Sequence, residues 1–247
     1  MNFEHSDKVK DLLARVSKFM DDNIYPAEAV YAEQMQAFRD EGNPWQVVPI
    51  VEDLKKKARA EGLWNFFLPE WNGGEGTTNL DYAYLAQEMG KSFLAPEVFN
   101  CAAPDTGNME VLAKYGTPAQ QKQWLEPLME GTIRSAFART EPDKACSDAT
   151  NVAATAVLDG DEWVINGDKH YISGAGDARC KVLIVMLNTN PDAPRKLRQS
   201  QILVPMDAPG LETVEGLQVL GDLDAPHGHM HLRFTNCRVP KDNILLG

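Results

Sequence analysis

The feature that most constrains this chain is a single change of hydrophobic period, at Gly131. Before Gly131, apolar residues recur at the three- and four-residue spacing of amphipathic helices, as in the segment Val9–Met20. After it, short runs of β-branched and aromatic residues are separated by turn residues. The pattern predicts an N-terminal all-α helical domain over residues 1–130, followed by an antiparallel, barrel-like β-domain over residues 131–247.

Several residues of the first half are typical helix ends. Ser6 is placed as the N-cap of a first helix that Pro26 would end, and Asn79 as the cap of a third helix. Thr117 followed by Pro118 indicates the start of the last helix of the predicted domain.

The second half carries two strong hairpin signals, Asp159-Gly160 and Asn166-Gly167. They separate three candidate strands and so predict a three-stranded meander: Val152–Leu158, Trp163–Ile165 and His170–Ser173. Further strands are expected at Val182–Leu187, Ile202–Pro205 and His229–Phe234.

Composition excludes some classes of function. A formal charge of −12 argues against binding to a nucleic-acid backbone. The longest apolar run, Val182–Leu187, is too short to span a membrane, and the N-terminus lacks the pattern of a secretory signal. Four scattered cysteines without a CxxC pair are expected to be free and buried. Together these features predict a cytoplasmic protein.

Three strings, in this order along the chain, carry a resemblance to a known family. They are Phe67–Glu70 with Gly73-Gly74, then Phe137-Ala138-Arg139-Thr140-Glu141-Pro142, then the run from Trp163 to Gly174. Their order and separation resemble those of the acyl-CoA dehydrogenase family, in a divergent branch. Members of that family carry a C-terminal four-helix bundle after the β-domain, and the resemblance implies that this bundle is missing from the 247 residues.

The resemblance also implies a flavin site that binds FAD. Thr140 and the backbone NH of Arg139 match the positions that hold the pyrimidine end of the flavin, and Ser173 matches the hydroxyl beside flavin N5. Tyr171 matches the aromatic residue, usually Trp, that packs on the flavin face, and Phe137 lines the same pocket.

Other polar residues receive more limited assignments. Ser147 matches a serine that contacts the pyrophosphate or the CoA arm, so it is a candidate substrate-binding residue. The family's catalytic base is a glutamate on the bundle, so no catalytic residue is assigned here, and Glu141 is expected to buttress its turn. His227, His229 and His231 alternate, but their spacing along a strand is too wide for one ion, so no metal site is predicted.

The implied function is α,β-dehydrogenation of an acyl-CoA thioester to a trans-2-enoyl-CoA, in fatty acid β-oxidation. The implied electron acceptor is an electron-transfer flavoprotein, and the full-length protein is expected to be a homo-oligomer. Without a base, the chain alone is expected to be inactive and to hold flavin weakly. Two alternatives stay open: a flavin oxidase or monooxygenase of the same fold, and a non-catalytic module that binds acyl-CoA or a partner protein.

Overall fold

The computed structural model describes residues 4–68 and 76–246, and the chain forms two compact units, Met1–Thr106 and Gly107–Gly247. Pro69, Glu70, Gly73 and Gly74, which belong to the first family-like string, lie outside the described residues. No helix in the described part of the chain is both long enough and apolar enough to cross a membrane. Each of the four cysteines is buried and free, as predicted.

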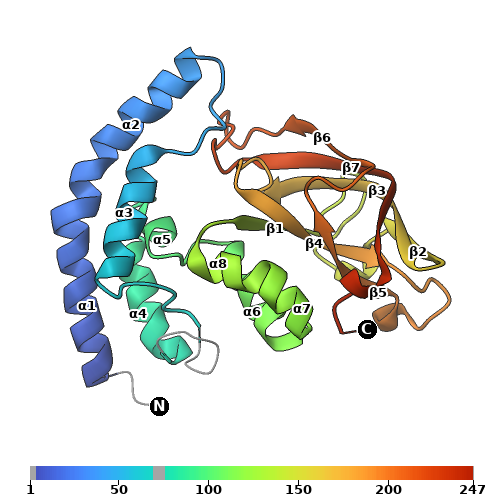
Figure 1. Cartoon of the computed structure of the whole chain (residues 1–247), viewed down its shortest axis with the longest axis horizontal. Coiled ribbons are helices and arrows are strands. Elements are labelled where there is room, and N and C mark those ends of the chain that lie inside the picture. Colours follow the sequence, from blue (N-terminus) through green and yellow to red (C-terminus); the bar gives the residue numbers. More distant parts are fainter. Residues whose placement is uncertain (1–3, 69–75, 247) are drawn as a thin grey trace. The chain divides into compact units, whose positions relative to one another are not determined.

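The first unit opens with one long helical rod (Figure 1), made of α1 (Asp7–Phe19), the π-helical segment η1 (Met20–Ile24) and α2 (Tyr25–Asp40). Ser6 caps α1, as predicted. The prediction that Pro26 ends the first helix is wrong. Pro26 lies in the first turn of α2, where a proline needs no amide hydrogen and its restricted φ suits a helix.

The described residues of the first unit contain three further α-helices: α3 (Pro49–Ala60), α4 (Asn79–Met89) and α5 (Ala95–Val98). Thr78, rather than Asn79, caps α4. Its hydroxyl accepts from the backbone of Asp81, and the Asp81 carboxylate accepts from Thr78 in return. The predicted cap was therefore one residue late, because Asp81 completes a capping box only with Thr78.

The second unit contains four helical segments before its sheet: α6 (Asp105–Tyr115), α7 (Pro118–Gln120), η3 (Gln121–Leu125) and α8 (Glu126–Glu130). Thr117 caps α7, as predicted. These helices belong almost entirely to the compact unit that holds the sheet. Compact units defined by packing need not coincide with domains defined by sequence, so the domain boundary at residue 130 stays a prediction.

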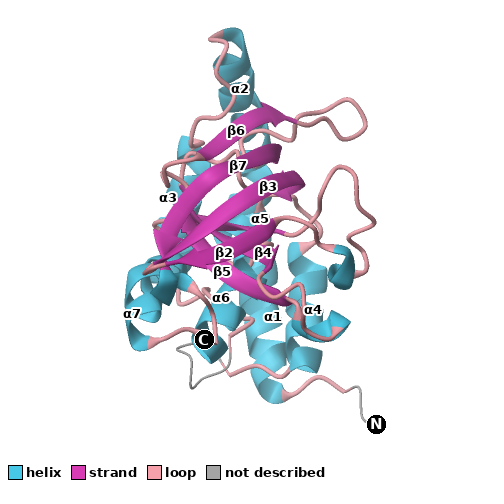
Figure 2. Ribbon diagram, turned by 90° about the vertical axis from the view of Figure 1, so that its right-hand side faces the viewer, coloured by secondary structure: helices cyan, strands magenta, loops and turns pink. Residues whose placement is uncertain are grey.

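The sheet of the second unit has seven strands in the order β1-β4-β2-β3-β7-β6, with β5 added on β4. Its strands curl around a buried interior (Figure 2), so the helical-then-β fold class is confirmed. Most pairs are antiparallel, but β1 pairs with β4 in parallel, which makes the sheet mixed. The strands are β1 (Arg134–Ala138), β2 (Thr155–Asp159), β3 (Glu162–Ser173), β4 (Cys180–Asn188), β5 (Gln199–Pro205), β6 (Leu211–Gly216) and β7 (His229–Pro240).

The predicted meander is correct at its first turn and wrong at its second. Asp159 and Glu162 pair across the hairpin at Gly160, which has a φ of 64°. At Gly167 the chain does not turn, because β3 runs unbroken and only its register with β7 shifts. Gly167 has a φ of 137°, and a Cβ there would lie 2.6 Å from the Cβ of Ala154. The glycine is therefore needed for a bulge and a close approach.

Candidate cofactor site

The ends of β1 and β3 lie side by side in the second unit. The backbone NH of His170 donates to the carbonyl of Thr140 over 2.8 Å, although no regular pairing joins the two strands. This bond brings Thr140 beside the strand end that carries Tyr171 and Ser173. Three of the predicted site residues, far apart in sequence, are thus held in one region by the backbone.

A buried lysine fixes the turn that follows β1. The side chain of Lys169 is fully buried and donates to Glu141 Oε1 at 2.9 Å, to the carbonyl of Arg139 at 3.0 Å and to that of Met186 at 2.7 Å. All three ammonium hydrogens therefore have acceptors. Burial lowers the pKa of Lys169 below its usual value, against the opposing effect of the Glu141 carboxylate.

The carboxylate of Glu141 also accepts three hydrogen bonds. Besides Lys169, it accepts from the backbone NH groups of Ala153 and Ala154, each at 2.9 Å. Each oxygen thus accepts from a backbone donor, and one also accepts from an ammonium. Glu141 buttresses the turn, and it is poorly placed to take a proton from a substrate.

Tyr171 has an unusual backbone conformation. Its φ is 53°, in the left-handed region, where its pairing with β7 is interrupted between Lys169 and Ile172. Such a conformation costs about 1–3 kcal/mol for a residue other than glycine. The side chain is nevertheless 46% exposed. An aromatic residue held at this cost with its side chain in solvent is typical of a position that contacts a ligand.

The side chain of Ser173 is within hydrogen-bond distance of His229, a contact that no pattern in the sequence indicates. Its Oγ lies 2.9 Å from Nδ1 of His229, its partner across the β3–β7 ladder. Nε2 of His229 lies 3.3 Å from Oδ2 of Asp224. His231, on the same face of β7, contacts Asp168 at 2.7 Å. Within the described residues no group of metal-ligating side chains forms, and each of these two histidines faces a carboxylate instead.

The remaining predicted residues lie on β1 and on the turn after it. Phe137 and Arg139 are half-buried at the end of β1. Ser147 is exposed on the turn before β2, and no hydrogen bond among the described residues connects it with the others. The structure therefore groups five of the six predicted site residues near the two strand ends and leaves Ser147 on the surface.

A cleft of about 400 Å³ adjoins the Glu141 turn. None of the six predicted site residues lines it. Its walls come from four separate segments, so no local string in the sequence indicates it. The lining residues are Glu141, Pro142, Asp143, Lys144, Ala153, Ala154, Asn166, Gly167, Asp168, His231 and Arg233.

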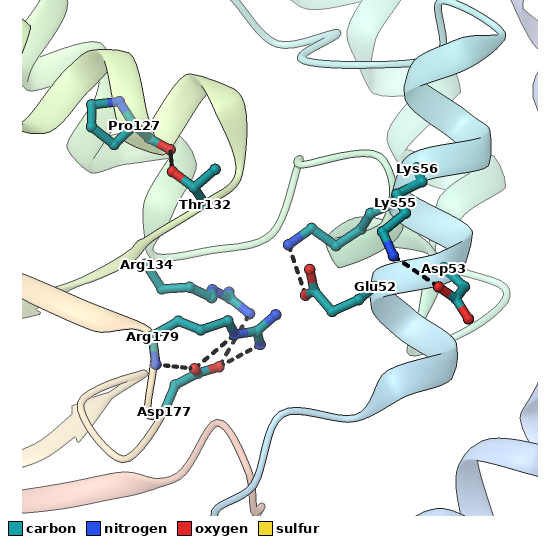
Figure 3. A network of polar contacts seen from close by, with 9 residues as sticks. All are labelled: Glu52, Asp53, Lys55, Lys56, Pro127, Thr132, Arg134, Asp177 and Arg179. Atoms are coloured by element: carbon teal, nitrogen blue, oxygen red, sulfur yellow. Dashed lines mark hydrogen bonds and ion pairs between the residues drawn. The ribbon is translucent and has the colours of Figure 1, made fainter.

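Asp177 anchors the turn that leaves Ser173. Its backbone NH donates to the carbonyl of Gly174 at 3.3 Å, and its carboxylate accepts two bonds from the Arg179 guanidinium, at 2.9 and 2.6 Å. Arg134 Nη1 lies 3.8 Å from Oδ2 of the same carboxylate, and Figure 3 shows both arginine side chains extending toward Asp177. Burial alone would raise the pKa of Asp177, but the two guanidinium groups outweigh it and hold that pKa below its usual value.

We expect Asp177 to make stability sensitive to acid. Because its pKa is lowered in the folded state, its contribution is complete above the usual aspartate pKa and is lost as pH falls through the lowered value. Asp177→Asn should cost about 2 kcal/mol at pH 7, and the difference from wild type should shrink below about pH 4. Urea unfolding at pH 7 and at about pH 4, 3 and 2 measures both. Asp207→Asn, at an exposed site, is the control, and a difference that stayed constant with pH would contradict the assignment.

A helical unit followed by a curled mixed sheet is the arrangement shared by the solved acyl-CoA dehydrogenases that this chain resembles. Family models agree with the fold in both halves. The acyl-CoA dehydrogenase N-terminal domain matches residues 6–132, and the acyl-CoA dehydrogenase middle domain matches residues 136–237. The chain belongs to the acyl-CoA dehydrogenase family.

Individual relatives extend this result. The chain is 49% identical to the probable acyl-CoA dehydrogenase FadE2 of Mycobacterium tuberculosis, over 99% of this chain and 59% of that protein. It is 48% identical to mouse acyl-CoA dehydrogenase family member 10, over 98% of this chain and 23% of the relative. A solved structure from Mycobacterium abscessus that carries the acyl-CoA dehydrogenase name superimposes with a TM-score of 0.93 at 48% identity, over 99% of this chain and 61% of that one. The chain therefore spans less than two thirds of each.

Proposed function

We propose that the complete gene product is an FAD-dependent acyl-CoA dehydrogenase that converts an acyl-CoA thioester into a trans-2-enoyl-CoA. Family membership supports an oxidoreductase of this kind. The observation that carries the proposal is the cluster at the ends of β1 and β3. There, the carbonyl of Thr140 accepts from the backbone of His170, which precedes the exposed and strained Tyr171, and Ser173 follows two residues later on the same strand.

These residues fit a flavin. A flavin needs an apolar surface for its ring system and hydrogen-bonding groups at its polar edge. We assign Tyr171 and Phe137 to the ring, the Thr140 hydroxyl and the Arg139 backbone NH to the pyrimidine edge, and Ser173 to N5. The carbonyls of Arg139 and Thr140 already accept from Lys169 and His170, which makes this edge rigid before any ligand binds. When bound, the flavin would accept hydride from the substrate.

The base and the partners are further parts of the proposal. Glu141 accepts hydrogen bonds from Lys169 and two backbone donors, so the base that removes the α-proton is expected outside residues 1–247.

Ser147 is assigned to the pyrophosphate or the CoA arm. We further propose an electron-transfer flavoprotein as acceptor, a homo-oligomeric gene product, a role in fatty acid β-oxidation and a cytoplasmic location, which the free, buried cysteines fit.

The test is to load the complete gene product with FAD and to add acyl-CoAs of increasing length without oxygen. Bleaching of the flavin band that depends on acyl-CoA is expected, followed by slow reoxidation when air is admitted. No bleaching with any acyl-CoA would contradict the proposal, and rapid reoxidation in air would favour an oxidase. The chain of residues 1–247 alone should not bleach. If it does, the base has been misplaced, and Glu141→Gln is the first variant to make.

Tyr171 offers a test that separates stability from flavin binding. Tyr171→Gly removes the strain of the left-handed backbone, so the ligand-free protein should be no less stable than wild type and up to about 1 kcal/mol more stable. Loss of the aromatic surface should weaken FAD binding by about 5- to 30-fold. Urea unfolding and fluorescence titration with FAD measure the two effects. Tyr171→Phe should keep most of the affinity, and a glycine variant that bound FAD as tightly as wild type would remove Tyr171 from the site.

A further inference from the structure

Ser173, His229 and Asp224 form one connected unit at the end of β3. Ser173 Oγ lies 2.9 Å from His229 Nδ1, and His229 Nε2 lies 3.3 Å from Asp224 Oδ2. The loop that carries Asp224 is attached to the same strand end, because the NH of Gly174 donates to the carbonyl of Gly228, and the NH of Gly228 donates to that of Asp224. The imidazole is only 20% exposed. Ser173 therefore already has a partner before any ligand arrives.

The number of protons limits what this unit can do. A serine hydroxyl has one proton, and a neutral imidazole has one N–H. Asp224 as a carboxylate can only accept, so a neutral His229 carries its proton on Nε2 and accepts the Ser173 proton at Nδ1. Ser173 then presents only lone pairs to a ligand. If His229 is doubly protonated, Nδ1–H donates to Ser173 Oγ, and the hydroxyl proton is released toward the ligand.

We propose that His229 is a positioning residue that determines whether Ser173 donates or accepts a hydrogen bond at the ligand site. The charged and titratable groups around it are Asp224 and His227 on the preceding loop and, next along β7, His231. His231 is occupied by Asp168. His229 acts only through Ser173, since its two nitrogens already face Ser173 and Asp224.

This inference rests on the proposed function in one respect, the identity of the ligand as a flavin. A donating hydroxyl stabilises electron density that arrives at a nearby ligand atom, and an accepting one does not. The doubly protonated ring should therefore accelerate flavin reduction by about 10²–10³-fold, the usual effect of one such donor where water is excluded.

The first experiment uses the 247-residue chain without ligand, labelled with ¹⁵N in its histidine rings. Nuclear magnetic resonance across the His229 titration should show a neutral ring protonated at Nε2, with Nδ1 as a hydrogen-bonded acceptor. Ser173→Ala should shift the His229 Nδ1 resonance toward that of a free acceptor and leave His231 unchanged. A neutral ring protonated at Nδ1, or a resonance that Ser173→Ala does not move, would overturn the proposal.

The second experiment compares four variants of the FAD-loaded complete gene product: His229→Gln, Ser173→Ala, the double variant and the control His231→Gln. For each variant, the rate of flavin reduction and the visible spectrum of the bound flavin are measured as a function of pH. The pH response of about 10²–10³-fold should persist in wild type and His231→Gln and disappear in the other three, with the double variant equal to Ser173→Ala. Additive losses in the double variant would overturn the proposal. If FAD does not bind, the proposed function fails, and the ligand-free experiment still decides the link between His229 and Ser173.

Discussion

Replacing Lys169 with methionine is expected to destabilise the protein by about 3–5 kcal/mol, the usual cost of breaking a buried ion pair from one side. The substitution keeps most of the side-chain volume but removes three hydrogen bonds, to Glu141 and to the carbonyls of Arg139 and Met186. The Glu141 carboxylate would stay buried without its cation. Against a typical stability of about 5–15 kcal/mol, this loss would remove between about one fifth and all of the free energy of unfolding.

Urea unfolding measures this effect, and two controls define its cause. Lys241→Met removes a lysine from an exposed ion pair with Asp161, whose side chains are 52% and 83% exposed, and should cost no more than about 1 kcal/mol. Adding Glu141→Gln to Lys169→Met removes the uncompensated charge, so the double variant should recover part of the loss. If Lys169→Met and Lys241→Met cost the same, the buried pair does not organise the turn.

Ser173→Ala is expected to slow flavin reduction by about 10²–10³-fold in the complete gene product, at a pH where His229 is doubly protonated, while changing FAD affinity little. The hydroxyl is assigned to the atom where negative charge appears only as hydride arrives, so its contribution is larger in the transition state than in the ground state. Loss of one such donor costs about 2.7–4 kcal/mol where water is excluded.

Anaerobic stopped-flow reduction by an acyl-CoA measures the rate, and fluorescence titration measures the affinity. Thr155→Ala removes a hydroxyl from an exposed position on β2 and should leave both unchanged. A Ser173→Ala variant that was reduced at the wild-type rate would exclude Ser173 from the reacting end of the site. A variant that lost FAD altogether would make Ser173 a binding residue instead.

The hydrophobic period predicted the fold class and most element positions because it depends on near neighbours along the chain. The strands around Val182–Leu187 and Ile202–Pro205 were found in this way, as was the Thr117 cap. Strands β1 and β6 were missed, because five- and six-residue segments with little alternation carry a weak signal. The parallel pairing of β1 with β4 could not be predicted from neighbouring residues either, since it joins segments about 46 residues apart in the sequence.

Turn chemistry was predictable only where nothing packed against the turn. Gly160 has open space around it and forms the expected hairpin, whereas Gly167 faces Ala154 and forms a bulge within a continuous strand. The two sequence signals are equivalent, and the difference comes from what lies opposite. Pro26 was mispredicted for a different reason, because it lies in the first turn of α2, where a proline is tolerated.

For the candidate site, the sequence by itself determined which residue types are available, through strings whose order matches a family, and it named Thr140, Tyr171 and Ser173. Only the tertiary structure decided how they are held: Lys169 buried against Glu141, Tyr171 in a left-handed conformation, and Ser173 joined to His229. Local propensity reflects interactions a few residues apart. The partners of a buried charge or a hydroxyl are selected by strand pairing and burial across the whole unit, as in the 56 residues between Ser173 and His229.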